Sequence, residues 1–440
     1  MGTDTAMGVG KKIVLGSEMA HSTALAAVRA AGKRQRRLNS RRGVAAIGVL
    51  AVLAAVGVYV PITLLTPYRN LSVAVAEPPT THLAAATVQW PKVGAAAIGA
   101  VGIPGIVASN GETGPLPIAS ISKVVTALVV LEQKPLALGE EGPGITFTAA
   151  DAALYRSYFA ANGKVEPVRV GLVLSERQVM ETMLVASANN YAETLSTWAF
   201  GSTPAYVAAT SAWLARHGFA HTTIVEPTGI SPRNTSTTAD LVGIGMLAVA
   251  QPVIAAIVAT KTLDIPVAGH ITNSNELLGI SGIDGIKTGT LEQAGACLLF
   301  SARYPSGSAT LTVVGVVLGG MDHPSINAAI QTMLVGVVAG FHPIQISTKG
   351  QSFAAIDSQW GSRAKAVSVQ DRTLFVWSDT TISGHVVLTP LVTADRGQRV
   401  GAVTFTAGKS MVELPLTLDR PLKDPGAGWR LTHPLDLIEK

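Results

Sequence analysis

The feature that most constrains this chain is an apolar stretch near its N-terminus. Residues 43–65 are 23 consecutive residues without a charge. A helix rises 1.5 Å per residue, so this stretch is long enough to cross a hydrocarbon layer of about 30 Å. We therefore expect a transmembrane helix here.

Basic residues directly precede this stretch and predict its orientation. Residues 1–42 hold nine Lys or Arg against two acidic residues, and six of the nine lie within residues 33–42. Such a cluster holds the N-terminus in the cytoplasm. We expect a single-pass protein of the cell membrane whose chain lies outside from Tyr68 onward. The alternative is a cleavable signal peptide with a cleavage site at Ala74-Val75-Ala76, and it exports the same part of the chain.

The location of the charge also bears on possible partners. The whole chain carries +5 and has a pI near 9.3, but the tail alone carries +7, so residues 43–440 carry −2. Nucleic acid is therefore not an expected partner. With 48% hydrophobic and 14% charged residues, the chain does not have the composition of a disordered protein. The single cysteine, Cys297, is interpreted as a core residue.

Composition and periodicity divide the chain into five segments. The expected segments are a cytoplasmic basic tail (1–42), a transmembrane anchor (43–65), a linker (66–89), a main domain (90–341) and a small β domain (342–440). The linker is rich in Pro, Ala, Thr and Val and has no helical periodicity. The small β domain consists of short alternating runs between Gly, Asp and Pro turns.

The main domain combines both periodicities. Apolar residues recur at helical spacing in residues 119–133, 177–200, 204–217, 238–259 and 325–339. Strands are expected within residues 93–108 and at 282–290, 295–301 and 309–318, the last two joined by a turn at Tyr304-Pro305-Ser306-Gly307. The pattern predicts an α/β (α+β) fold in which helices flank an antiparallel sheet.

The first motif with chemical potential is Ser120-Ile121-Ser122-Lys123, at an expected helix start. Three residues apart on a helix, the Lys123 amine and the Ser120 hydroxyl come within hydrogen-bond reach. The alternative is an ordinary helix start with a solvated lysine. The apolar run after Lys123 predicts a buried helix, where an unpaired ammonium is costly. We therefore favour a nucleophile with a neighbouring amine.

The second motif is Ser187-Ala188-Asn189, and it lies among apolar residues. Two polar side chains in such surroundings need partners, which a cleft between helices supplies. Another Ser-x-Asn, at Ser325-Ile326-Asn327, is interpreted as a helix start.

The third motif is Lys287-Thr288-Gly289, on an expected strand. The glycine permits close approach of another backbone, and Lys and Thr offer a cation and a hydroxyl to an anion. A turn that ends a hairpin is the alternative.

These three motifs, in this order on helix, helix and strand, resemble the active site of the serine penicillin-binding proteins and β-lactamases. The flanking sequence is similar to that of the low-molecular-mass D-alanyl-D-alanine carboxypeptidases over about residues 90–341. This similarity rests on Pro117-Ile118-Ala119, Asn190-Tyr191-Ala192, Glu226-Pro227-Thr228-Gly229-Ile230 and Asp284-Gly285-Ile286. The resemblance implies a β-lactamase/transpeptidase-like domain and a penicillin-sensitive enzyme that trims the terminal D-alanine from peptidoglycan stem peptides.

The resemblance also assigns catalytic roles. Ser120 is the nucleophile that forms an acyl-enzyme, and Lys123 is its base. Burial beside the cation Lys287 is expected to keep the Lys123 amine neutral for part of the time. Ser187 relays a proton to the departing D-alanine.

Substrate-binding roles follow from the same resemblance. Asn189 orients Lys123 and a substrate amide, while Lys287 and Thr288 hold the terminal carboxylate. The substrate lies along the strand past Gly289, and the backbone N–H groups of Ser120 and Thr290 hold the oxyanion. The expected partners are stem peptides ending in D-Ala-D-Ala, β-lactams as covalent inhibitors, and the membrane.

No metal or organic cofactor is expected. His217 and His221 are four residues apart, but Gly218 lies between them at an expected helix end and no acidic third ligand is near.

The sequence departs from this family in two places. Family members commonly have a basic side chain soon after the Val-Val-Leu-Gly strand, where this chain offers only His323. The usual C-terminal amphipathic anchor is not recognisable, so the N-terminal helix is expected to replace it. Two alternatives remain open: a β-lactamase of the same fold, and a catalytically silent wall-binding protein.

Overall fold

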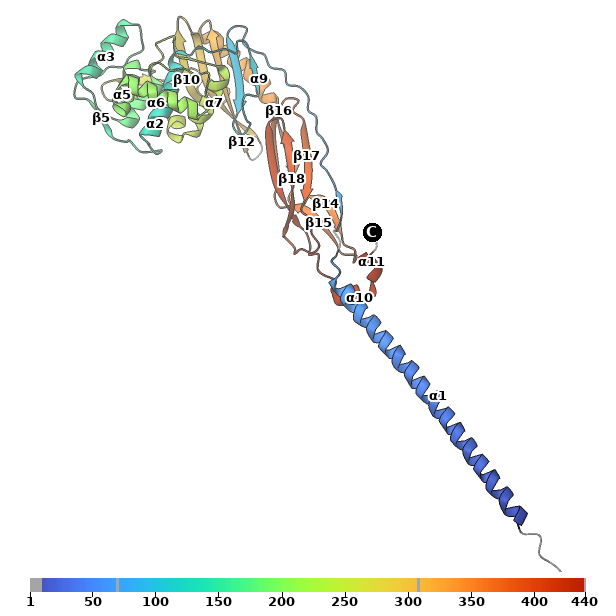
Figure 1. Cartoon of the computed structure of the whole chain (residues 1–440). Helices are drawn as coiled ribbons and strands as arrows, with labels where there is room; N and C mark the ends of the chain where they lie inside the picture. The colour runs from blue at the N-terminus through green and yellow to red at the C-terminus, as the bar shows by residue number, and fades with distance from the viewer. Residues whose placement is uncertain (1–9, 69–70, 307–308, 439–440) are drawn as a thin grey trace, which may run out of the picture.

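The chain forms a long N-terminal helix, a small β domain and a larger mixed domain, which follow one another in space (Figure 1). The computed structural model describes residues 10–68, 71–306 and 309–438. The mixed domain lies at the end of the β domain remote from the helix. The combination of a mixed domain with antiparallel sheets, a small β domain and an apolar N-terminal helix confirms the predicted fold class.

The N-terminal helix α1 spans Gly10–Leu65, so it includes both the apolar stretch and most of the basic tail. Its segment Arg34–Leu65 contains an 18-residue window with a mean hydropathy of 2.4 and is long and apolar enough to cross a membrane, a property that signal sequences near an N-terminus share. Residues 1–9 of the predicted tail, and the side chains of Lys11, Lys12, Arg29 and Lys33, lie outside the described part of the chain.

The segment expected as a free linker packs along the β domain instead. Strand β1 (Ser72–Val75) pairs with β14 (Ser352–Asp357), and Thr81 bridges Ile382. An unpaired sheet edge offers a row of N–H and C=O groups, and this extended segment occupies it. The segment therefore contributes an edge strand.

The main sheet of the mixed domain is antiparallel, with the strand order β10-β11-β12-β2-β3. Helix α9 (His323–Ala339) lies on one side of it. On the other side lie α2 (Ser122–Gln133), α5 (Asn189–Phe200), α6 (Thr203–Arg216) and α7 (Thr238–Ala250) (Figure 1). Separate apolar clusters fill the two sides. The strands of this domain are β2 (Ala95–Ala100), β3 (Ala108–Asn110), β4 (Leu116–Pro117), β5 (Gly144–Thr146), β6 (Val173–Ser175), β7 (Thr235–Ser236), β8 (Thr262–Ile265), β9 (Gly269–Thr272), β10 (Ile283–Leu291), β11 (Gly295–Ser306) and β12 (Ala309–Gly320).

The helices of the mixed domain lie close to the predicted ranges, except that α3 was not predicted and that the periodicity did not indicate two breaks. They are η1 (Ala119–Ile121), α2 (Ser122–Gln133), α3 (Ala149–Ala160), α4 (Glu176–Val185), α5 (Asn189–Phe200), α6 (Thr203–Arg216), α7 (Thr238–Ala250), α8 (Pro252–Val258) and α9 (His323–Ala339). Pro252 separates α7 from α8, because proline lacks the N–H that a continuous helix needs. The expected helix 177–200 divides at Ser187, whose φ of 62° is not helical.

The predicted strands 282–290, 295–301 and 309–318 correspond to β10, β11 and β12, and the last two run several residues further. Gly307, in the turn predicted between them, lies outside the described residues.

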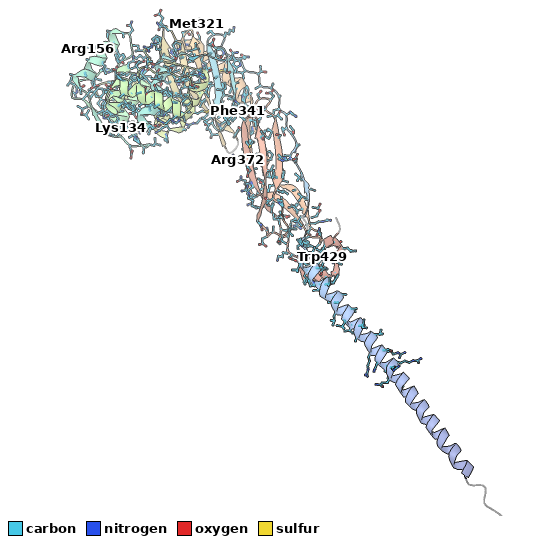
Figure 2. All side chains as sticks on the ribbon, viewed as in Figure 1. Lys134, Arg156, Met321, Phe341, Arg372 and Trp429 are labelled. Atoms are coloured by element: carbon cyan, nitrogen blue, oxygen red, sulfur yellow. The ribbon has the colours of Figure 1, made fainter. Side chains whose placement is uncertain are left out.

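The β domain combines a six-stranded sheet, β1-β14-β15-β19-β18-β17, with a pair, β13-β16. Its core includes Phe353, Phe405 and Leu416. Phe341 lies where the mixed domain joins it (Figure 2). The remaining elements are β13 (Phe341–Ser347), β15 (Arg363–Ser368), β16 (Arg372–Trp377), β17 (Ile382–Leu388), β18 (Arg399–Ala407), β19 (Ser410–Leu418), α10 (Gly426–Thr432) and α11 (Pro434–Ile438).

Helix α10, which the sequence did not predict, packs against the end of α1. The Arg430 guanidinium donates through Nη1 to the carbonyls of Thr63, Leu64 and Thr66, at 3.5, 3.0 and 2.6 Å. The last carbonyls of a helix have no partner within the helix and carry partial negative charge, so a cation stabilises them. Tyr59 adds a hydrogen bond of 2.6 Å to the Leu431 carbonyl.

Three aromatic side chains join this helix end to the β domain. The Tyr68 ring lies 4.9 Å from that of Trp360 and 6.3 Å from that of Trp429, measured between centroids. Trp360 belongs to the turn between β14 and β15, and Trp429 belongs to α10 (Figure 2). The Arg430 guanidinium lies 3.8 Å from the Tyr68 centroid, in cation–π contact. Helix α1, the β domain and α10 thus contact one another at one place.

We predict that Arg430→Ala frees α10 from α1. Charge-assisted hydrogen bonds contribute about 2 kcal/mol, so amide hydrogen exchange in Gly426–Thr432 should accelerate by roughly 30-fold. Arg430→Lys keeps the charge but lacks the fork that reaches several carbonyls, so its effect should be intermediate. Unchanged exchange in Arg430→Ala would show that the aromatic contacts alone hold this junction.

Candidate active site

Ser120 lies in the short helix η1, immediately before α2, and two glycines allow other segments to reach its backbone. A Cβ on Gly229 would lie 1.9 Å from the Ala119 carbonyl oxygen, and a Cβ on Gly289 would lie 2.9 Å from that of Ile118. Gly229 also has a φ of 84°, in the left-handed region that favours glycine. The Glu226–Ile230 loop and strand β10 can therefore both pack directly against the turn that carries Ser120.

Lys123 is the second residue of α2, about one turn after Ser120, and is fully buried. Its Nζ lies 2.9 Å from Ser120 Oγ, 2.7 Å from Asn189 Oδ1 and 2.6 Å from the Thr228 carbonyl oxygen. These partners come from three segments that are distant in sequence. The first two motifs therefore meet at the Lys123 amine.

Burial lowers the pKa of Lys123 to about 7, because the interior disfavours the charged amine. Glu226 acts in the opposite direction, and the cation of Lys164 lowers this pKa further. The sequence indicated Lys287 as the neighbouring cation, but Lys164, which no motif singled out, has that effect on Lys123. Burial and then Lys123 itself hold the pKa of Lys287 well below its usual value.

Ser187 and Asn189 occupy the break between α4 and α5. Ser187 is only 2% exposed and adopts a φ of 62°, while Asn189 begins α5 and accepts the hydrogen bond from Lys123. Both residues line the same cleft as Ser120. The structure thus brings Ser187 into the site, although the hydrogen bonds of Lys123 go to other groups.

The third motif lies on β10, which pairs with β11 at the edge of the main sheet. Lys287 is 1% exposed, and its Nζ donates to Ser274 Oγ at 3.3 Å and to the Thr288 carbonyl at 3.3 Å. Ser274 Oγ also lies 2.5 Å from Thr288 Oγ1. Ser274 thus connects the amine and the hydroxyl of this motif, and no sequence motif indicated it.

Thr290 and His323 meet at the far end of the same strand. Thr290 Oγ1 lies 2.7 Å from His323 Nε2. Burial, followed by the cation of Lys164, lowers the pKa of His323, so its imidazole is mainly neutral at pH 7. His323, at the start of α9, therefore offers this end of the cleft a hydrogen-bonding group rather than a fixed charge.

Glu226 uses its carboxylate to shape the loop that contacts Lys123. Its Oε2 accepts from the backbone N–H and hydroxyl of Thr228, and its Oε1 accepts from Gly229 N, Ser231 N and Asn234 Nδ2. With this many donors, the carboxylate orients the Thr228 carbonyl toward Lys123. It has little remaining capacity to activate a water molecule.

The motifs share one open cleft of about 820 Å³. Ser120, Ser187, Asn189, Thr288, Gly289 and Thr290 line it directly, and Lys123 and Lys287 are buried behind it. Asn162, Gly163 and Lys164 come from a loop that no sequence motif connected with the site. The only sequence signal for this loop was the pairing of a turn-forming Asn-Gly with a lysine, which is common on protein surfaces.

Two residues considered from the sequence lie away from the cleft lining. Cys297 is fully buried on β11, as expected for a core residue. His217, at the end of α6, has its ring 4.4 Å from that of Trp213 between centroids. Among the described residues, no group of three or more potential ligands forms a metal site.

A helix-flanked antiparallel sheet with these three motifs in one cleft defines the low-molecular-mass serine penicillin-binding class of protein. The chain belongs to the peptidase S11 family, described as D-alanyl-D-alanine carboxypeptidase, which matches residues 102–321. This match lies within the part of the chain where the resemblance was recognised, and it confirms that assignment and a serine-type hydrolase class.

Curated relatives and solved structures agree with this family. A D-alanyl-D-alanine endopeptidase of Pseudomonas aeruginosa is 31% identical over 206 residues, covering 45% of this chain and 63% of the relative. A D-alanyl-D-alanine endopeptidase of Escherichia coli is 31% identical over 192 residues, which cover 42% of this chain and 58% of the relative. The chain thus spans about three fifths of the length of these relatives.

The structural matches show the fold. A peptidoglycan synthesis regulatory factor (PBP3) from Streptococcus pneumoniae matches with a TM-score of 0.59 and 19% identity, covering 77% of this chain and 100% of that one. Penicillin-binding protein 5 from Haemophilus influenzae matches with a TM-score of 0.57 and 18% identity, and the match covers 79% of this chain and 100% of that one.

The pKa of Lys123 leads to a prediction about pH. An amine that accepts the Ser120 proton must be neutral, so the acylation rate by a β-lactam should fall about tenfold per pH unit below pH 7 and level off above it. A solvated lysine would put this midpoint near pH 10.4. The measurement is the second-order acylation rate between about pH 5 and 9.

Lys123→Arg provides the matched test, because it keeps a positive charge but offers no neutral base. Its acylation should be slower by about 10² to 10⁴ at pH 7 and above, and the difference from the wild type should narrow at lower pH, where Lys123 is itself protonated. Normal acylation by this variant would show that the base lies elsewhere.

Proposed function

We propose that this protein is a serine D-alanyl-D-alanine carboxypeptidase that acts through an acyl-enzyme on Ser120. The observation that carries the proposal is the Lys123 amine, which is fully buried, has a pKa of about 7 and lies 2.9 Å from the Ser120 oxygen. An amine in this condition can accept a proton from a serine hydroxyl near neutral pH.

In the acylation step, the Ser120 hydroxyl transfers its proton to Lys123 Nζ as its oxygen attacks the carbonyl of the penultimate D-alanine. The backbone N–H groups of Ser120 and Thr290 stabilise the resulting oxyanion. When the C–N bond breaks, the departing amine of D-alanine takes a proton that Ser187 relays. The products are an ester on Ser120 and free D-alanine.

The substrate is a peptidoglycan stem peptide that lies along β10. Its terminal carboxylate binds the Thr288 hydroxyl, and the buried Lys287 amine supplies positive charge next to this hydroxyl. The support is that Ser274 Oγ makes hydrogen bonds to both groups. Gly289 has no side chain to block an added strand. Asn189 orients Lys123 and an amide of the substrate upstream of the bond that breaks. His323 takes the place of the usual basic side chain, so we expect weak binding of the terminal carboxylate.

Hydrolysis of the ester is slow when the acyl group comes from penicillin. The Glu226 carboxylate is occupied by the donors of its own loop, which argues against a fast lactamase-type deacylation. We therefore propose that β-lactams are covalent inhibitors of this protein rather than its substrates.

A second candidate activity is D-alanyl-D-alanine endopeptidase, the name of both curated relatives. This reaction uses the same nucleophile and base but breaks a bond whose leaving group is the side-chain amine of a second peptide. The open cleft leaves room for such a leaving group.

Product analysis separates these activities. Residues 66–440 incubated with a pentapeptide ending in D-Ala-D-Ala should release D-alanine, and an endopeptidase should instead divide a cross-linked peptide dimer. Ser120→Ala removes only the nucleophilic oxygen, so it should abolish both product formation and labelling by a fluorescent penicillin. Labelling of the variant at the wild-type rate would refute Ser120 as the nucleophile.

We further propose that α1 anchors the protein, with the N-terminus in the cytoplasm and the mixed domain outside. The support is the charge-free segment of α1 after a basic cluster, together with Arg430, which binds the outer end of that helix. Under this proposal the cleft lies beyond the β domain, on the side of the membrane where peptidoglycan is built.

The anchor and the signal peptide predict different mature proteins. The anchored form keeps residues 1–76, whereas cleavage after Ala76 leaves a chain that starts at Glu77. We expect the mass of the intact chain, and a membrane-bound N-terminal fragment after external protease treatment of cells stripped of their outer layers. Recovery of soluble protein beginning at Glu77 would contradict the anchor.

A further inference from the structure

Lys164 is an exposed cation in the lining of the cleft. It lies in the loop between α3 and β6, beside Asn162 and Gly163, which also line the cleft. Lys123 and Lys287 are at most 1% exposed, whereas the Lys164 side chain faces solvent. In the described part of the chain, the ion pairs do not include Lys164.

The loop that carries Lys164 is fastened to α5. The backbone N–H of Asn189 donates to the Lys164 carbonyl at 2.8 Å. The amide side chain of Asn190 makes two hydrogen bonds to the backbone of Glu166, at 3.2 and 2.9 Å, and the Tyr191 hydroxyl donates to the Pro167 carbonyl at 3.1 Å. Residues directly after Ser187 thus hold this loop at the cleft, and Lys164 is presented from a fixed backbone.

The position of Gly163 supports a built loop. A Cβ on this residue would lie 2.5 Å from Asn189 Nδ2 and 3.1 Å from the Tyr158 carbonyl oxygen, so a larger residue would have to displace the Asn189 side chain that binds Lys123. Lys164 follows directly and so stands next to Asn189, the residue to which we assign a substrate amide upstream of the bond that breaks. The terminal carboxylate, in contrast, is assigned to Lys287 and Thr288 on β10.

The charge of the cleft is unbalanced. The Lys164 cation lowers the pKa of Lys123, Lys287 and His323, so its field extends across the whole site. Glu292 is the acidic residue in the cleft lining. Glu166, on the same loop, lies within the field of Lys164, since burial raises the pKa of Glu166 and the Lys164 cation lowers it, but no ion pair joins the two among the described residues. A substrate with a single terminal carboxylate would satisfy the β10 end and leave Lys164 without a paired anion in the cleft.

We propose that Lys164 binds a second carboxylate of the substrate, located in the peptide upstream of D-Ala-D-Ala. This inference rests on the proposed function and names its substrate class: acidic peptides that end in D-Ala-D-Ala and carry a free carboxylate in one of the two preceding residues. An exposed ion pair of this kind contributes modestly to affinity and strongly to the choice between an acid and its amide.

The test uses full-length Ser120→Ala protein in detergent, so that peptides bind without turnover. Two pairs of synthetic peptides ending in D-Ala-D-Ala carry a side chain that is a carboxylate in one member and a carboxamide in the other. The first pair has this side chain directly before D-Ala-D-Ala, and the second pair has it one residue earlier. Calorimetry measures the dissociation constants.

We expect the acid to bind about fivefold more tightly than the amide in one of the two pairs, and that pair identifies the position of the carboxylate. Adding Lys164→Met should abolish the preference, so that acid and amide bind with about equal dissociation constants. Lys164→Arg should keep the preference. The preference should also weaken at high salt. Equal affinities in both pairs, or a preference that survives Lys164→Met, would overturn the inference.

Turnover by the wild-type protein separates this inference from the proposed function. If the wild-type chain releases no D-alanine while the acid preference and its loss in Lys164→Met are observed, the carboxypeptidase proposal fails and the anion site stands. If D-alanine is released at equal kcat/KM from acid and amide peptides and the affinities are also equal, the function stands and the anion site is wrong.

Discussion

The active site depends on satisfying one buried amine. Lys123 has no access to water, so every hydrogen bond that it loses on burial must be replaced within the protein. Its three partners are a serine hydroxyl, an asparagine amide and a loop carbonyl, and each comes from a different segment. The same contacts that stabilise the amine therefore assemble Ser120, the second motif and the Glu226–Ile230 loop around it. Because burial also lowers the pKa of this amine to about 7, one physical constraint both assembles the site and gives it an amine that can accept a proton near neutral pH.

The motif residues could be found from the sequence because each combines a polar group with apolar surroundings. Lys123 precedes an apolar run and Ser187 stands among Leu, Val and Ala, so their polarity needed an explanation that a cleft supplies. Helix and strand periodicity indicated the type of the main-sheet strands and of the long helices that flank them, but it did not indicate the order of the strands, the helix α3 or the short strands β4 to β9. The break at Ser187 was not predicted, because the apolar spacing of α4 continues into α5 and a positive φ at a serine leaves no trace in periodicity.

Other parts of the site were beyond the reach of the sequence. Ser274 and Lys164 belong to loops whose composition is typical of any surface, and only the fold brings them to β10 and α5. The segment 66–89 was expected as a linker, but part of it forms the edge strand β1. A sequence rich in Pro and Thr without periodicity is compatible with either structure, so the sequence could not distinguish them. Helix α10 is seven residues long, and its role rests on Arg430, whose partners are carbonyl groups that no side-chain pattern reveals.

The junction at Arg430 has a consequence for where the enzyme can work. A catalytic domain on a flexible linker can occupy many distances from its point of attachment. A catalytic domain on a rigid connection stays at one distance from that point. Here the segment that follows α1 pairs with the β domain through β1, and Arg430 of α10 binds the carbonyls at the end of α1 (Figure 1). If α1 spans a membrane as we propose, the length of the β domain sets the distance between the lipid and the cleft, and the enzyme can reach only peptides at that distance.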